Sequence, residues 1–181
     1  MSSPKVVAFQ RRSPRFGTIL VPIDGSVQSM ATAIKALDFV RRMDARVVVF
    51  HSIPSYQYPI YLGGIPFEYP SEADYETQCR AIAQRYLDLV SGLGADMGVA
   101  VGTRLEFNPD SVQGILDAAR QDDCSLIYLG AHGRSGVSPL FLGNVAHKVL
   151  TLARIPVLLD RPTPEDVGRA QALMTQRGIE P

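Results

Sequence analysis

Short runs of bulky apolar residues alternate along this chain with segments in which apolar residues recur every three or four positions. The runs are typical of strands buried in a parallel sheet, and the segments between them have the spacing of amphipathic helices. This alternation predicts an α/β fold: a three-layer α/β/α sandwich with a mostly parallel five-stranded sheet. We expect the strands at 16–24, 46–53, 99–105, 125–130 and 156–160.

Some of the predicted helices carry start and stop signals. Ser71 with Asp74 resembles a capping box, and we expect the long helix that follows it to end at Gly92 and Gly94. After the last strand, apolar residues at helical spacing predict a short amphipathic helix over 163–176.

The sequence is interpreted as one domain with two flanking pieces. Residues 1–15 are basic and contain prolines and serines, which predicts a flexible N-terminal tail. The domain spans 16–160, and residues 161–181 form a C-terminal extension that contains the short helix. Within the domain, 54–70 is rich in proline, glycine and tyrosine. Such an insertion is often a lid or an interaction surface, and packing over the protein's own surface is the alternative.

Composition narrows the class of protein. The 18 basic and 18 acidic residues balance, which argues against a nucleic-acid partner because such proteins normally carry a basic excess. No apolar run approaches the ~18 residues that cross a bilayer, and the first residues lack the long apolar region of a signal peptide. Cys79 and Cys124 have no partner spacing. We interpret them as structural thiols of a reducing compartment and expect a cytoplasmic protein.

Polar residues stand where the first two strands end. Ligands of parallel sheets bind at the carboxyl ends of strands, so Asp24 is a candidate ligand contact; alternatively, Asp24 or Ser26 caps the next helix. His51 and Ser52 follow at the end of the second strand. A packed His51 is favoured over a catalytic or metal-binding one. If the first and fourth strands are neighbours, Asp24 lies close to Gly130.

The fourth strand leads into a glycine-rich loop and then into a helix. The glycines are Gly130, Gly133 and Gly143, helical spacing resumes at Val145, and Asn144 stands where an N-cap would stand. In α/β proteins this arrangement binds phosphate, because free backbone N–H groups and the positive end of the helix dipole point into the loop. The sequence therefore predicts a phosphate cradle.

Familiar catalytic motifs do not occur in the sequence. It contains neither the Walker lysine loop nor the dinucleotide fingerprint, and Gly133–Gly136 has the wrong spacing for a nucleophile elbow. The histidines form no metal-ligand pattern with neighbouring cysteines or carboxylates. This favours a binding protein over a hydrolase, and no catalytic residue is predicted.

Four stretches together resemble the universal stress protein (UspA-like) superfamily. They are Leu20–Ser26 (LVPIDGS), Val48–Ser52 (VVFHS), Gly130–Gly136 (GAHGRSG) continued by Leu142–Ala146 (LGNVA), and Ile155–Leu159 (IPVLL). The match covers about residues 16–160. It implies an adenine nucleotide α-hydrolase-like sheet with strand order 3-2-1-4-5.

The ATP-binding branch of that family carries G-x-x-G, nine residues, then G-[S/T], and the three glycines keep this spacing. The resemblance implies ATP or AMP as ligand, with Mg²⁺ as a possible companion. Asp24 would meet the ribose hydroxyls or the metal, and the backbone of Ile23 and Ser52 would meet the adenine. Asn144 replaces the family's Ser or Thr, which keeps the backbone N–H but loses a hydroxyl. The implied nucleotide contacts are Pro22, Ile23, Asp24, Ser52, Leu129, Gly130, His132, Gly133, Arg134, Gly143, Asn144 and Val145.

The resemblance also implies a homodimer through the last strand, because an apolar edge strand needs a partner. The expected interface is Pro156, Val157, Leu158 and Leu159. The implied function is a dimeric, nucleotide-binding stress-response regulator with an unknown protein partner and little or no turnover. Two alternatives stay open, a nucleotide-independent dimeric scaffold and a slow ATPase.

Overall fold

The computed structural model describes residues 16–57, 70–133 and 142–179. The predicted tail, most of the proline- and tyrosine-rich segment, and Arg134 lie outside the described residues.

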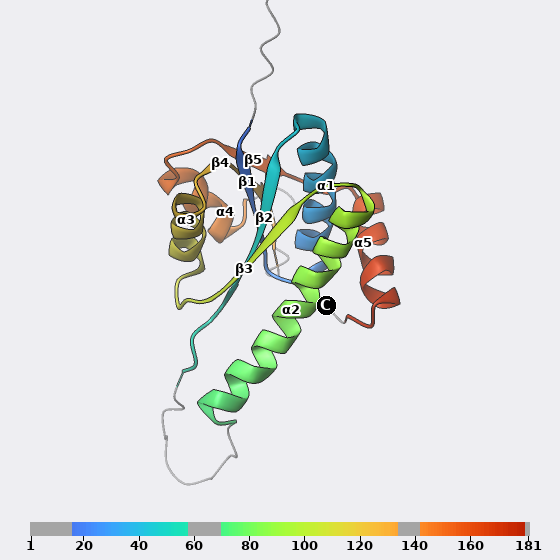
Figure 1. Cartoon of the computed structure of the whole chain (residues 1–181). Coiled ribbons are helices and arrows are strands. Elements are labelled where there is room, and N and C mark those ends of the chain that lie inside the picture. The colour runs from blue at the N-terminus through green and yellow to red at the C-terminus, as the bar shows by residue number, and fades with distance from the viewer. Residues whose placement is uncertain (1–15, 58–69, 134–141, 180–181) are drawn as a thin grey trace, which may run out of the picture.

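A five-stranded parallel sheet forms the centre of the fold (Figure 1). The strand order is β3-β2-β1-β4-β5, so the predicted order is confirmed. β1 lies in the middle and β5 at one edge. From β1 the strands β2 and β3 are added toward one edge, whereas β4 and β5 are added toward the other, so the strand order reverses between β1 and β4. The strands are β1 (Thr18–Ile23), β2 (Arg46–Ile53), β3 (Val101–Phe107), β4 (Cys124–Gly130) and β5 (Val157–Asp160).

Helices cover both faces of this sheet, with α1, α2 and α5 on one face and α3 and α4 on the other (Figure 1). Successive side chains of a strand point to opposite faces. Ile19 and Val21 therefore join the core beneath α1 and α2, while Leu20 joins the core beneath α3 and α4. The predicted three layers are confirmed. The helices are α1 (Val27–Met43), α2 (Glu72–Asp96), α3 (Ser111–Gln121), α4 (Asn144–Leu152) and α5 (Pro164–Gln176).

The predicted end of the long helix is wrong. α2 continues through Gly92 and Gly94 to Asp96. Gly94 is a packing residue, because a Cβ at that position would lie 2.3 Å from the Cγ2 atom of Val101 on β3. The glycine therefore lets α2 and β3 approach each other closely. The packing of the helix on the strand outweighs the low helix propensity of glycine.

The C-terminal helix α5 is part of the main core. A capping box of Thr163 and Asp166 starts it, and its Ala170 and Met174 are fully buried in the cluster that includes α1. The short helix predicted for 163–176 is thus present, and it packs against α1.

Candidate functional site

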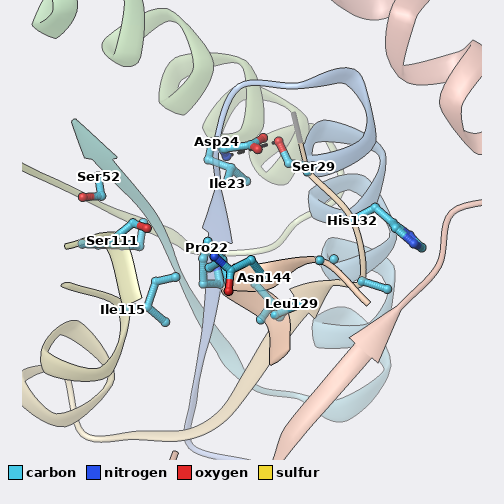
Figure 2. Close-up of a pocket in the computed structure, with 17 residues that line it drawn as sticks. Pro22, Ile23, Asp24, Ser29, Ser52, Ser111, Ile115, Leu129, His132 and Asn144 are labelled. Atoms are coloured by element: carbon cyan, nitrogen blue, oxygen red, sulfur yellow. Dashed lines mark hydrogen bonds between the residues drawn. The ribbon is translucent and has the colours of Figure 1, made fainter. Parts of the chain in front are cut away.

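A cavity of about 420 Å³ opens at the carboxyl ends of β1, β2 and β4 (Figure 2). The N-termini of α3 and α4 complete its walls. Its volume is within the usual range for small-molecule sites. The lining residues are Pro22, Ile23, Asp24, Ser29, Phe50, Ser52, Ser111, Ile115, Leu129, Gly130, Ala131, His132, Gly133, Gly143, Asn144, Val145 and Ala146.

All the predicted nucleotide contacts within the described residues lie in this lining, and Arg134 is outside the described residues. Residues far apart in sequence are brought together because β1 and β4 are neighbours in the sheet. Their exits therefore face one crevice, as ligand sites of open parallel sheets do.

Asp24, which follows β1, is fixed by the start of α1. Its Oδ1 accepts hydrogen bonds from the backbone N of Ser26 at 3.0 Å and from the Ser26 Oγ at 2.6 Å. Ser26 is the N-cap, since its Oγ accepts from the N–H of Ser29 at 3.2 Å. Ser26 therefore caps the helix, and Asp24 holds the capping residue while lining the cavity.

Gly133 lies against the second oxygen of Asp24. A Cβ on Gly133 would be 2.5 Å from the Asp24 Oδ2. This close approach joins the exit of β1 to the glycine-rich loop after β4, and it requires a residue without a side chain. Close backbone approach, rather than a left-handed turn, is the reason for this glycine, because its φ is not positive.

The two ends of the glycine-rich loop are tied together. The N–H of Gly143 donates to the carbonyl of Ala131 at 2.9 Å, and the N–H of Ala131 donates to the carbonyl of Asp160 at 2.7 Å. A Cβ on Gly143 would lie 3.2 Å from that Ala131 oxygen. The loop therefore leaves β4 and enters α4 at a fixed place.

The N-cap of α4 is Gly143, so the prediction of Asn144 as N-cap is wrong. Asn144 is the first helical residue, and within the described part of the chain no side-chain hydrogen bond caps this helix. Side chains cap α1, α2, α3 and α5. The first amides of a helix have no acceptor within the helix. In α4 they lie at the cavity wall, since Gly143, Asn144, Val145 and Ala146 all line it, and the helix dipole favours an anion there.

His51 is buried, and its Nδ1 donates to the carbonyl of Ile23 at 3.0 Å. Its ring packs against Tyr86, with the ring centroids 5.8 Å apart. His51 is thus a packed residue, as predicted, and it fixes the carbonyl of Ile23.

The sequence interpretation missed one wall of the cavity. Ser111 and Ile115 come from α3 (Figure 2). Phe50 comes from β2. The sequence signal was Asp110, which caps α3 through hydrogen bonds to the N–H groups of Val112 and Gln113. An N-cap that follows directly on a strand exit places the first turn of its helix at the ligand edge of the sheet. Other missed lining residues are Ser29, Ala131 and Ala146.

The described ranges contain no group of three or more His, Cys, Asp or Glu side chains that could hold a metal ion. None of the helices in those ranges has the length and apolar character needed to cross a membrane.

The predicted interface consists of Val157, Leu158 and Leu159 on β5, at the edge of the sheet, and Pro156 directly before that strand. Pro156 is exposed, and Val157, Leu158 and Leu159 are partly buried. Their pairing with a second chain stays a prediction.

A model of the universal stress protein family matches residues 15–161. The chain belongs to the universal stress protein family. The resemblance predicted from the strand exits and the glycine spacing is therefore confirmed.

Curated relatives carry the same family name. This universal stress protein is 28% identical over 153 residues to universal stress protein YxiE of Bacillus subtilis, an alignment that covers 81% of this chain and 99% of the relative. It is 31% identical over 146 residues to a universal stress protein of Thermus aquaticus, with 81% of this chain and 99% of the relative covered.

Solved structures show the same fold. A universal stress protein family member from Burkholderia pseudomallei superposes with a TM-score of 0.65 and 26% identity, covering 83% of this chain and 98% of that one. A universal stress protein in complex with cAMP has a TM-score of 0.61 and 16% identity, covering 82% of this chain and 99% of that one. A third, from Arabidopsis thaliana with AMP bound, has a TM-score of 0.58 and 14% identity, covering 83% and 94%. At these low identities the last two comparisons establish the fold alone.

Proposed function

We propose that this universal stress protein binds an adenine nucleotide, ATP or AMP, with the phosphates at the N-terminus of α4. The observation that carries the proposal is that α4 begins in the wall of the cavity with a glycine N-cap and, among the described residues, with no side-chain cap. A phosphate oxygen would accept hydrogen bonds from the first backbone amides of α4, which in the other helices donate to a capping side chain. The glycines keep the loop close to its neighbours, since a Cβ on Gly133 would lie 2.5 Å from the Asp24 Oδ2 and one on Gly143 would lie 3.2 Å from the Ala131 oxygen.

The rest of the lining suits a nucleoside. Phe50, Ile115 and Pro22 offer apolar surface for a base, and Asp24 offers a carboxylate for ribose hydroxyls. Structures of the same fold have been solved with cAMP, dAMP and AMP, ligands that share an adenine and a phosphate. The chemical class of those ligands supports the proposal for this chain.

A divalent metal would enter with the phosphates. Asp24 is the carboxylate of the lining, and one carboxylate together with substrate phosphates is a usual way for proteins to bind Mg²⁺. Dimerisation through β5 is part of the proposal and is supported by the apolar edge at Val157–Leu159. The cytoplasmic location and a further protein partner stay predictions.

Calorimetric titration with AMP and with ATP tests the proposal, using two changes at one position. Asn144→Asp places a carboxylate at the first turn of α4, which we expect to stabilise the helix by about 0.3–1 kcal/mol through its dipole. The same carboxylate repels the phosphates and should abolish binding. Asn144→Ser, the matched control, supplies the family's hydroxyl and should tighten binding.

The outcomes separate the candidate functions. Absence of binding by the unmutated protein contradicts the proposal and favours the nucleotide-independent scaffold. Unchanged binding by Asn144→Asp contradicts the placement of the phosphates. Release of phosphate from bound ATP, lost in Asp24→Ala, favours the slow ATPase.

A further inference from the structure

The helix α5 begins beyond the part of the chain that matches the family model, which ends at residue 161. Two features nevertheless join it to the domain. Ala170 and Met174 are fully buried, and Asp166, at its first turn, faces Lys35 of α1 with 3.5 Å between the Oδ2 and the Nζ. The extension therefore meets α1 through both apolar packing and charge.

Lys35 makes a second and shorter ion pair. Its Nζ lies 2.7 Å from the Oδ1 of Asp160, whose side chain is 8% exposed. The hydrogen bond to Asp160 holds the pKa of Lys35 above its ordinary value in spite of partial burial. Lys35 therefore bridges the end of β5 and the start of α5, and we call Asp160, Lys35 and Asp166 the carboxylate bridge.

The carboxylate bridge is directly connected to the candidate phosphate cradle. Asp160 pairs with Gly130 across β4 and β5, and its carbonyl accepts the N–H of Ala131 at 2.7 Å. The carbonyl of Ala131 in turn accepts the N–H of Gly143 at 2.9 Å, and Gly143 is the N-cap of α4. A short series of ion pairs and hydrogen bonds thus connects α5 to the N-terminus of α4.

α1 also contacts the start of the glycine-rich loop, at Gly130. Thr32, one turn before Lys35, is fully buried, and its Oγ1 lies 3.1 Å from where a Cβ of Gly130 would be. Lys35 and Thr32 lie three residues apart on one face of the helix. The pair of Lys35 with Asp160 therefore clamps α1 and β5 together around the first residues of the glycine-rich loop.

We propose that Lys35 is a positioning residue of the nucleotide site, and that the C-terminal extension sets nucleotide affinity through the carboxylate bridge. The proposal rests on the proposed function. Lys35 does not line the cavity, so it acts through Asp160 and the two loop hydrogen bonds. Without Lys35, the buried carboxylate of Asp160 has lost its charge partner and moves toward solvent. The carbonyl that holds Ala131 then moves with it.

Two measurements on four variants test this. Affinity for AMP is measured by calorimetry, and amide hydrogen exchange is followed at Ala131 and Gly143, with Val49 in the centre of the sheet as the reference. Lys35→Met should weaken AMP binding about tenfold, in the range of ordinary couplings between sites. It should also accelerate exchange at Ala131 and Gly143 more than at Val49.

The other variants isolate the cause. Asp166→Asn should act in the same direction but less strongly, because Asp166 is the more distant carboxylate. Lys35→Met with Asp160→Asn removes the unpaired carboxylate that would move toward solvent, so it should recover part of the AMP affinity lost in Lys35→Met. Arg42→Met, the matched control, breaks an exposed ion pair with Asp38 on the same helix and should change neither measurement.

Equal acceleration of exchange at Val49 and at the two loop amides would mean that Lys35 merely stabilises the fold, which overturns the proposal. AMP affinity within twofold of the unmutated protein in both Lys35 variants overturns it as well. Failure of the unmutated protein to bind AMP is a different result, because it contradicts the proposed function. In that case the exchange comparison alone decides whether Lys35 positions the loop.

Discussion

The contact between Gly133 and Asp24 makes a sharp prediction about Gly133→Ala. A Cβ at this position would lie 2.5 Å from the Asp24 Oδ2, whereas ordinary contact begins at 3.4 Å, so one partner must move by about 0.9 Å. The carboxylate cannot rotate away freely, because Ser26 holds its Oδ1 through two hydrogen bonds of 2.6 and 3.0 Å.

The magnitude follows from what must be lost. Moving the carboxylate by that distance breaks at least one hydrogen bond to a charged group, which contributes about 1.5–3 kcal/mol. For a domain of this size the loss corresponds to a fall in melting temperature of about 3–12 °C. The displaced Asp24 side chain would also narrow the cavity, so nucleotide affinity should fall in parallel.

Thermal and urea unfolding of single and double variants provides the assay. Asp24→Ala removes the oxygen that the new methyl group would meet, so in that background Gly133→Ala should cost little. Gly168→Ala is the control: it lies on α5 and a Cβ there has open space, so it should be neutral or stabilising. Additive effects of Gly133→Ala and Asp24→Ala would refute the reasoning, since they would show that the two residues do not meet.

Three further predictions concern the core and the ionisable groups. Gly94→Ala should destabilise by about 1–3 kcal/mol in urea unfolding through overpacking, and Val101→Ala should relieve the effect. Burial raises the pKa of Cys124 to about 11, so iodoacetamide at pH 8 should label it only after unfolding. The raised pKa of Lys35 adds stability that is complete below the unfolded value of about 10.4. This stability is lost as pH rises through the folded value, so the difference in urea midpoint between the unmutated protein and Lys35→Met should shrink from pH 8 to pH 11.

The sequence was informative wherever the signal is local. Asp24 and the glycines at 130, 133 and 143 could be assigned to one crevice because strand exits follow apolar runs, and parallel exits share an edge. Gly94 was misread because its role depends on Val101, which it meets only in the folded chain.

The wall from α3 was missed for a related reason. Ser111 reaches the cavity because α3 packs over β2, β4 and β1, and no periodicity within one helix reveals which strands it covers. The cap of α4 differs by a single position, within the usual uncertainty of helix ends. That one position places the backbone amide of Asn144 in the first turn of the helix. Asn144 then offers an N–H group to an anion, and its side chain does not cap the helix.

The uncapped start of α4 has a thermodynamic consequence. A glycine N-cap such as Gly143 costs only a few tenths of a kcal/mol relative to Ser, Thr, Asn or Asp, so the domain without ligand carries a small local weakness at that helix. Under the proposed function the nucleotide phosphate is the absent cap, and binding adds stability that grows with the logarithm of ligand concentration. The protein would then convert the cellular supply of nucleotide into resistance to unfolding. A melting temperature that does not rise with added AMP would contradict this view.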